Sequence, residues 1–112
     1  MSNKKIDNSI KSLLILFKDS ISRAFPGFVE QVILFGSESR GNAHESSDID
    51  VLVITTHDDW RMGDEIRRIG YELDLFDNSR LSIQVLSRSH IRMLQHNDFL
   101  FIKNVQRDGI TV

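Results

Sequence analysis

Two aspartates separated by one residue, Asp48 and Asp50, stand at the start of an apolar, β-branched run that ends at Thr55. Alternate side chains of a strand point to the same face, so we expect the two carboxylates to project together from Cα atoms about 6.5–7 Å apart. Carboxylates this close repel each other, and one of them keeps a proton unless a cation lies between them. The pair therefore predicts a site for a divalent cation.

Mg²⁺ is the cation that this pair suits best. It prefers oxygen ligands and is often held by one or two carboxylates together with the phosphates of a substrate. Two such ions about 3.5–4 Å apart can stabilise an in-line displacement at phosphorus. Asp48 and Asp50 are therefore predicted to be metal ligands and catalytic residues that bind one or two Mg²⁺ ions.

A glycine and a serine, Gly36 and Ser37, come directly after the preceding apolar run, which ends at Phe35. Glycine lets a phosphate approach the backbone, and free N–H groups after a strand bind anions. The Ser37 hydroxyl adds one donor, and Arg40 is near enough in sequence to reach a triphosphate or to fix the loop. Gly36, Ser37 and Arg40 are therefore predicted to bind phosphate groups.

Each of these features also has a simpler interpretation. Aspartates cap turns and start helices, and a Gly-Ser pair can simply end a strand. The combination of the two, placed between two predicted strands, is what favours a functional site.

The composition indicates one ordinary domain, residues 1–112. The chain is 40% hydrophobic and 27% charged, and its net charge of −2 argues against broad, sequence-independent nucleic-acid binding. It has no cysteine, which excludes disulfides and thiolate metal sites and fits a reducing cytoplasm. No apolar run approaches the roughly 18 residues of a membrane span, so we expect a cytoplasmic protein that does not enter a membrane.

Periodicity and breaker residues predict the elements that must position the site. Helices are expected over 7–25, from Asp58 or Asp59 to Phe76, from Ser87 or Ser89 to Leu94, and over 98–106. Strands are expected over 31–35, 48–55 and 81–86, with an edge strand over 110–112 and a loop over 37–47. This order indicates an α/β (α+β) domain with a small mixed β-sheet and helices packed on it.

The spacing Gly-Ser, ten residues, then Asp-x-Asp resembles the signature of the DNA polymerase β-type nucleotidyltransferase superfamily. The run GSESRGNAHESSDIDVLV is especially similar to the minimal nucleotidyltransferase branch, whose members often contain G-S-x-x-x-G followed by S-D-I-D. This core likeness covers about 20 residues, and a weaker likeness extends through LSIQVLS to FLFIKNVQRDGI.

The resemblance implies a nucleotidyltransferase-like fold and an enzyme that uses Mg²⁺ and an NTP, with ATP expected. Such enzymes transfer a nucleoside monophosphate, often AMP, to an acceptor hydroxyl and release pyrophosphate. The resemblance assigns phosphate binding to Gly36 and Ser37 and metal binding to Asp48 and Asp50, with Arg40 as a further nucleotide-binding candidate. Small relatives are commonly antitoxins of an all-helical HEPN-type toxin, so we expect such a toxin as partner, and a homo-oligomer as a further possibility.

One feature departs from the family pattern. Active relatives usually carry a third carboxylate on the strand after the Asp-x-Asp strand, where it helps to activate the acceptor hydroxyl. Here the polar positions at that strand are Arg80, Ser82 and Gln84, and none is acidic. Asp74 and Asp77 are expected at the end of a helix. Three interpretations stay open: a slow enzyme, an enzyme completed by a partner's carboxylate, or a binding module that neutralises a partner protein with weak or no catalysis.

The remaining polar residues favour structural interpretations. No metal-ligand spacing links the four histidines, His44, His57, His90 and His96. Ser37 has no base beside it in sequence for covalent catalysis. A solvated helix face with local ion pairs is expected for Glu65, Arg67, Arg68 and Glu72.

Trp60 is expected to anchor the core, with a place in a nucleotide pocket as the alternative. A glycosyltransferase, whose D-x-D also binds a metal–nucleotide complex, is a third function, disfavoured because 112 residues cannot hold its usual fold.

Overall fold

The computed structural model of the protein describes residues 8–35, 49–77, 81–97 and 100–112. Within these ranges the helices are α1 (Asn8–Ala24), α2 (Trp60–Asp77), α3 (Arg88–His96) and α4 (Leu100–Asp108). The strands are β1 (Val29–Phe35), β2 (Ile49–Thr55), β3 (Leu81–Ser87) and β4 (Ile110–Thr111). The predicted α/β fold with a small mixed sheet is confirmed.

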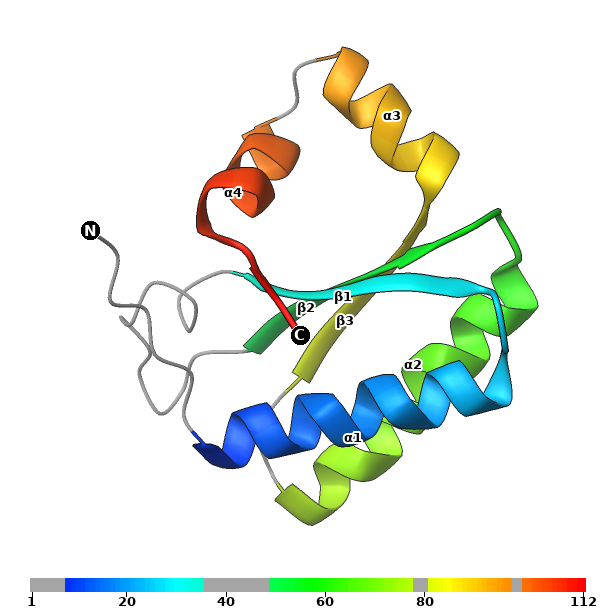
Figure 1. Ribbon diagram of the computed structural model, residues 1–112, viewed down its shortest axis with the longest axis vertical. Helices are drawn as coiled ribbons and strands as arrows, with labels where there is room; N and C mark the ends of the chain where they lie inside the picture. The colour runs from blue at the N-terminus through cyan, green and yellow to red at the C-terminus, as the bar shows by residue number, and fades with distance from the viewer. Residues whose placement is uncertain (1–7, 36–48, 78–80, 98–99) are drawn as a thin grey trace.

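The sheet has the strand order β3-β2-β1-β4. β1 pairs antiparallel with both β2 and β4, whereas β2 and β3 run parallel. Parallel neighbours need a crossover connection, and α2 supplies it. Figure 1 shows α1 and α2 together on one face of the sheet and α3 and α4 on the other. The sheet therefore lies between two layers of helices.

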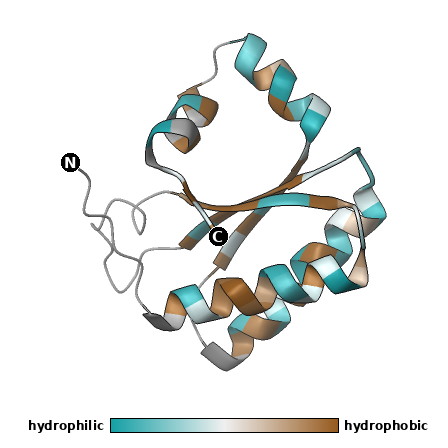
Figure 2. Cartoon of the chain, viewed as in Figure 1, coloured by the Kyte–Doolittle hydropathy of each residue, from teal (hydrophilic) through white to brown (hydrophobic). Residues whose placement is uncertain are grey.

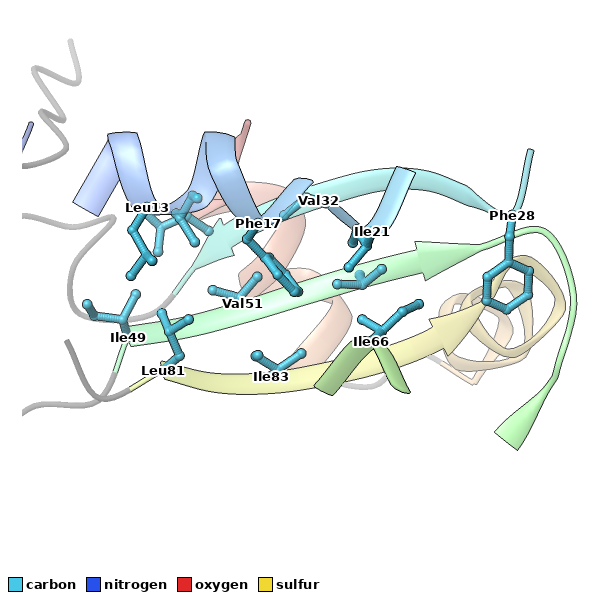
Figure 3. Packing of buried hydrophobic residues seen from close by; sticks show 13 residues of the cluster. Leu13, Phe17, Ile21, Phe28, Val32, Ile49, Val51, Ile66, Leu81 and Ile83 are labelled. Atoms are coloured by element: carbon cyan, nitrogen blue, oxygen red, sulfur yellow. The ribbon is translucent and has the colours of Figure 1, made fainter. Parts of the chain in front are cut away.

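The main hydrophobic core lies between the sheet and the α1–α2 layer. Leu14, Phe17 and Ile21 are fully buried and follow the helical spacing that predicted α1. Alternate strand residues meet them from the sheet, among them Val32, Leu34, Val51, Val53 and Ile83. The strands are correspondingly the most continuously hydrophobic elements in Figure 2, and Figure 3 shows Phe17 within the cluster.

The opposite face of the sheet carries a smaller core under α3 and α4. Its buried residues are Phe35, Leu52 and Val105. The aliphatic residues around them, Ile33, Ile54, Leu86 and Ile91, are only partly buried. No residue of α3 is buried. The α3–α4 layer therefore covers its face of the sheet less completely than α1 and α2 cover theirs.

Two of the helices begin at capping residues that the sequence offered as candidates. The Asp59 carboxylate accepts hydrogen bonds from the N–H groups of Arg61 and Met62, at 3.1 and 3.0 Å, at the start of α2. The Ser87 hydroxyl accepts one from the N–H of His90 at 3.1 Å, at the start of α3. Each cap satisfies backbone donors that the first helical turn leaves without partners.

Two glycines of α2 should respond in opposite ways to alanine. A Cβ at Gly70 would clash with Cδ1 of Ile83 and would lie 3.0 Å from Cε1 of Phe17. Gly70→Ala is therefore expected to lower the free energy of unfolding by about 1–3 kcal/mol through overpacking. A Cβ at Gly63 would meet Val85 at 3.7 Å, an ordinary contact. Gly63→Ala should be neutral or raise stability by up to about 1 kcal/mol through helix propensity.

Urea unfolding of the two alanine variants measures this contrast. Equal stability of the variants would contradict the close approach of α2 to the sheet at Gly70.

Candidate functional site

Asp50 occupies the second position of β2 and is half-buried. It pairs in register with Phe35 of β1 and with Ser82 of β3. Directly paired residues of neighbouring strands point to the same face. Leu52, two residues further along β2, belongs to the core under α3 and α4. Asp50 and Ser82 therefore project from the less completely covered face of the sheet.

The segment that carries the rest of the predicted motif joins the sheet beside Asp50. Phe35 is the last residue of β1 and lies opposite Asp50, and Ile49 is the first residue of β2. The two strand ends that flank this segment thus meet at the same end of the sheet. The other predicted site residues, Gly36, Ser37, Arg40 and Asp48, lie outside the described residues, and their roles stay predictions.

β3 is the strand on which a third carboxylate was expected. β3 presents Ser82 beside Asp50 and Gln84 opposite Leu52, and no residue of this strand is acidic. β3 therefore presents a hydroxyl, and no carboxylate, beside Asp50.

Asp74 does not take that role. It lies in α2, as expected, and α2 ends at Asp77. The Asp74 carboxylate accepts a hydrogen bond of 2.9 Å from the N–H of Leu81, the first residue of β3. Asp74 therefore holds the start of β3 from the α1–α2 side of the sheet, away from the face that carries Asp50.

A cavity of about 270 Å³ lies on the same face as Asp50, between the sheet and the α3–α4 layer. Its lining is mainly aliphatic, with two side-chain amides and one hydroxyl as the polar part: Ile33, Leu52, Ile54, Ile91, Ile102, Val105, Gly109, Gln31, Gln95 and Thr111. The lining of the cavity begins at Leu52. Leu52 is the next residue of β2 after Asp50 on this face, because alternate residues of a strand share a face. An apolar cavity with a few polar groups nearby is the common form of a small-molecule site.

An ion pair joins the sheet to α3 at the end of β1 that lies away from Asp50. The Arg88 guanidinium donates to the Glu30 carboxylate, with Nε 2.9 Å from Oε1. This hydrogen bond lowers the pKa of Glu30 from its ordinary value. Both side chains are substantially exposed, so the pair orients α3 more than it adds stability.

Trp60 does not anchor the core, so this expectation from the sequence is wrong. Its side chain is 72% exposed, and the Arg61 guanidinium lies 5.3 Å from its ring centroid. α2 buries the side that carries Gly63, Ile66 and Gly70, and Trp60 is rotated from these positions by about 60–120°.

Trp60 instead lines a separate hollow of about 210 Å³ near Thr55, at the other end of β2 from Asp50. The alternative that Trp60 lines a nucleotide pocket stays a prediction.

The expected ion pairs on the exposed face of α2 are confirmed. Arg68 pairs with Glu65 and Glu72, and Arg67 pairs with Asp64 at 2.8 Å. Hydrogen bonding to Glu65 is the main cause that raises the pKa of Arg68, and it lowers the pKa of Glu65. Exposed pairs of this kind contribute little to stability.

The described parts of the chain hold no cluster of three or more His, Cys, Asp or Glu residues that could bind a metal ion. Among the helices formed by these same parts, none is long and apolar enough to cross a membrane.

The fold and the position of Asp50 define an α/β domain with an acidic residue at one end of a mixed sheet. Residues 14–106 match the nucleotidyltransferase domain family. The chain therefore belongs to this family, and the resemblance drawn from its sequence is confirmed. A comparison with curated proteins gave no significant match.

Several solved structures are similar. A toxin–antitoxin MntA–HpeT variant with two Asp-to-Glu substitutions is 18% identical, covers 84% of this chain and 68% of its own, and has a TM-score of 0.51. A nucleotidyltransferase candidate from Sulfolobus solfataricus is 19% identical over 96% of this chain and 87% of its own, with a TM-score of 0.48. A toxin–antitoxin structure with AMP-PNP is 20% identical, covers 86% of this chain and 69% of its own, and has a TM-score of 0.47. At these identities the likeness concerns the fold alone, and the MntA–HpeT structure supports it.

Proposed function

We propose that the protein is a cytoplasmic, Mg²⁺-dependent nucleotidyltransferase that moves AMP from ATP to an acceptor hydroxyl. The observation that carries the proposal is the place of Asp50, half-buried beside the two strand ends that flank residues 36–48, the segment that contains Gly36, Ser37 and Asp48. This place lies within a chain of the nucleotidyltransferase domain family.

The described part of the site fits one carboxylate ligand of a magnesium ion. A half-buried carboxylate on a strand is fixed in direction, which suits a hard cation that demands regular geometry. Asp48 is proposed as the second ligand, and Gly36, Ser37 and Arg40 as contacts to the triphosphate. Bound Mg²⁺ would offset the charge that the carboxylates and phosphates bring together.

The reaction forms a bond between the acceptor oxygen and the α-phosphorus of the nucleotide. The bond from that phosphorus to pyrophosphate breaks, and the acceptor hydroxyl gives up its proton. Ser82 lies beside Asp50 but is not a base at neutral pH, so the residues of β3 leave proton removal to water, to a partner or to the substrate itself.

A protein acceptor is proposed, in particular an all-helical toxin of HEPN type. The similar MntA–HpeT structure is a toxin–antitoxin structure, which supports a toxin as the partner. The two substituted aspartates of that variant are separated by one residue, as Asp48 and Asp50 are here.

A second candidate function is a nucleotidyltransferase-like binding module that neutralises a partner protein with little or no transfer. The specific observation in its favour is β3, the strand expected to carry a third carboxylate, which presents Ser82 beside Asp50 and has no acidic residue.

Labelled ATP separates the two functions. The whole chain is incubated with Mg²⁺, the product of its neighbouring reading frame, and ATP labelled at either the α- or the γ-phosphate. We expect the α-label to reach the partner protein and the γ-label to leave as pyrophosphate, and we expect EDTA to stop both. Nucleotide binding without label transfer would support the binding module instead.

Ser82→Asp is expected to speed the reaction. It introduces a carboxylate on the strand next to Asp50, and general-base catalysis contributes about 10²–10⁴-fold. We expect at least a tenfold rise in the initial rate of label transfer, roughly the lower end of such gains. Gln84→Asp, one step further from the end of the sheet, is the matched control. Equal rates for Ser82→Asp and the unchanged chain would show that this position does not activate the acceptor.

A further inference from the structure

A hydroxyl lies beside the candidate metal ligand on the neighbouring strand. Ser82 of β3 pairs in register with Asp50 of β2, and both side chains project from the face of the sheet that carries α3 and α4. Paired strands run about 4.8 Å apart, so the two side chains are immediate neighbours. Ser82 is only half-buried, and among the described residues its hydroxyl has no hydrogen-bond partner. Ser82 therefore offers an accessible oxygen nucleophile next to Asp50.

The described helices leave the space above Ser82 unfilled. Gln84, the next residue of β3 on this face, is exposed, whereas Leu52, its partner on β2, is fully buried. On the other side of Asp50, Phe35 of β1 is buried in the core under α3 and α4. A ligand held at Asp50 therefore has room over β3, where Ser82 lies, and not over β1.

The other hydroxyl groups on the described strands lie farther from Asp50. Thr55 and Ser87 are buried at the opposite end of β2 and β3. Thr111 belongs to β4, and β1 separates that strand from β2. Of these strand hydroxyls, Ser82 alone is a direct neighbour of Asp50.

We propose that Ser82 is itself an acceptor, so that the protein transfers AMP from ATP to its own Ser82. This inference rests on the proposed nucleotidyl transfer and names a second acceptor for the same site. The Ser82 oxygen attacks the α-phosphorus and forms a phosphodiester bond, while the bond from that phosphorus to pyrophosphate breaks. The hydroxyl proton passes to water, because β3 has no acidic residue to take it.

The modification closes the site that forms it. The attached AMP keeps its phosphate beside Asp50, where the phosphates of the next ATP bind under the proposed function. A tethered group competes at an effective concentration of about 1 mM, so the modified chain is expected to bind ATP at least roughly tenfold more weakly. The reaction therefore stops at one AMP per chain. It is also slow, since a serine without a neighbouring base is a weak nucleophile.

Mass spectrometry of the whole chain tests the inference. The chain is incubated with Mg²⁺ and ATP labelled at the α-phosphate, once alone and once with the product of its neighbouring reading frame. We expect the chain alone to gain the mass of one AMP, and fragmentation to place this AMP on Ser82. Ser82→Ala should lose the label. Ser22→Ala is the matched control and should keep it, because it removes an exposed hydroxyl from α1.

ATP binding gives a second readout that does not depend on turnover. Equilibrium dialysis before and after the incubation should show the weakened binding in the unsubstituted chain and no change in Ser82→Ala. Equal affinity of the modified and unmodified chains would contradict an acceptor beside Asp50.

The two incubations separate this inference from the proposed function. Label on another residue of the chain, or transfer to the partner protein without label on Ser82, would overturn the inference and leave the proposed function standing. Absence of transfer to either protein would refute both.

Discussion

Asp50→Asn is expected to reduce Mg²⁺-dependent nucleotidyl transfer by roughly 10²–10⁴-fold, because a catalytic metal supplies several kcal/mol of transition-state stabilisation. The amide has almost the shape of the carboxylate but carries no charge, so it is a poor ligand for a hard cation. Asp50→Ala removes the oxygen ligands altogether, and we expect it to abolish Mg²⁺-dependent nucleotide binding.

The fold should survive these changes. Asp50 is only half-buried, and removal of one of two neighbouring carboxylates relieves repulsion in the metal-free protein. The melting temperature should therefore stay the same or rise slightly, as circular dichroism can measure. Asp19→Asn is the control, since Asp19 is an exposed residue of α1 whose ion pair with Arg23 is local. A melting temperature lowered by many degrees in Asp50→Ala would mark Asp50 as a structural residue instead.

Phe17→Ala is expected to cause the largest loss of stability of any single truncation to alanine in α1. Phe17 is fully buried at the centre of the main core and packs close to the position of Gly70 on α2. Removal of a buried phenyl ring costs its transfer free energy and leaves a cavity, together about 3–5 kcal/mol. For a chain of this size the melting temperature should fall by roughly 10–20 °C.

Chemical denaturation at fixed temperature measures this loss directly. Ile15→Ala is the matched control on the same helix, because its side chain is 51% exposed, and it should change stability by no more than about 0.5 kcal/mol. Equal losses in the two variants would contradict the burial that separates these neighbouring positions.

Much of the local structure was predictable because it depends on neighbours in the chain. The helical spacing of apolar residues placed the first helix at 7–25, and it spans Asn8–Ala24. Helix starts were predicted at Asp58 or Asp59 and at Ser87 or Ser89 from side-chain chemistry alone, and Asp59 and Ser87 accept the expected backbone hydrogen bonds. Capping and periodicity are local properties, so a single sequence carries them.

The sequence predicted which residue types form the candidate site, but it did not predict which residues lie beside one another. Asp50 was expected on a strand, and β2 contains it. Its pairing with Phe35 and Ser82 depends on the register of β2 against two strands that are distant from it in the sequence, and no local pattern specifies that register. The roles of Gly36 and Asp48 remain predictions for functional experiments.

The amino-acid sequence by itself thus determined the element order, the family and the acidic residue on β2. Only the tertiary structure decided that Asp50 projects from the sheet face that carries α3 and α4, that Ser82 lies beside it, and that Trp60 faces solvent. The physical reason is packing between distant segments. α2 approaches the sheet along the side where Gly70 lets Ile83 and Phe17 come close, and this choice of helix side leaves its tryptophan outside the core.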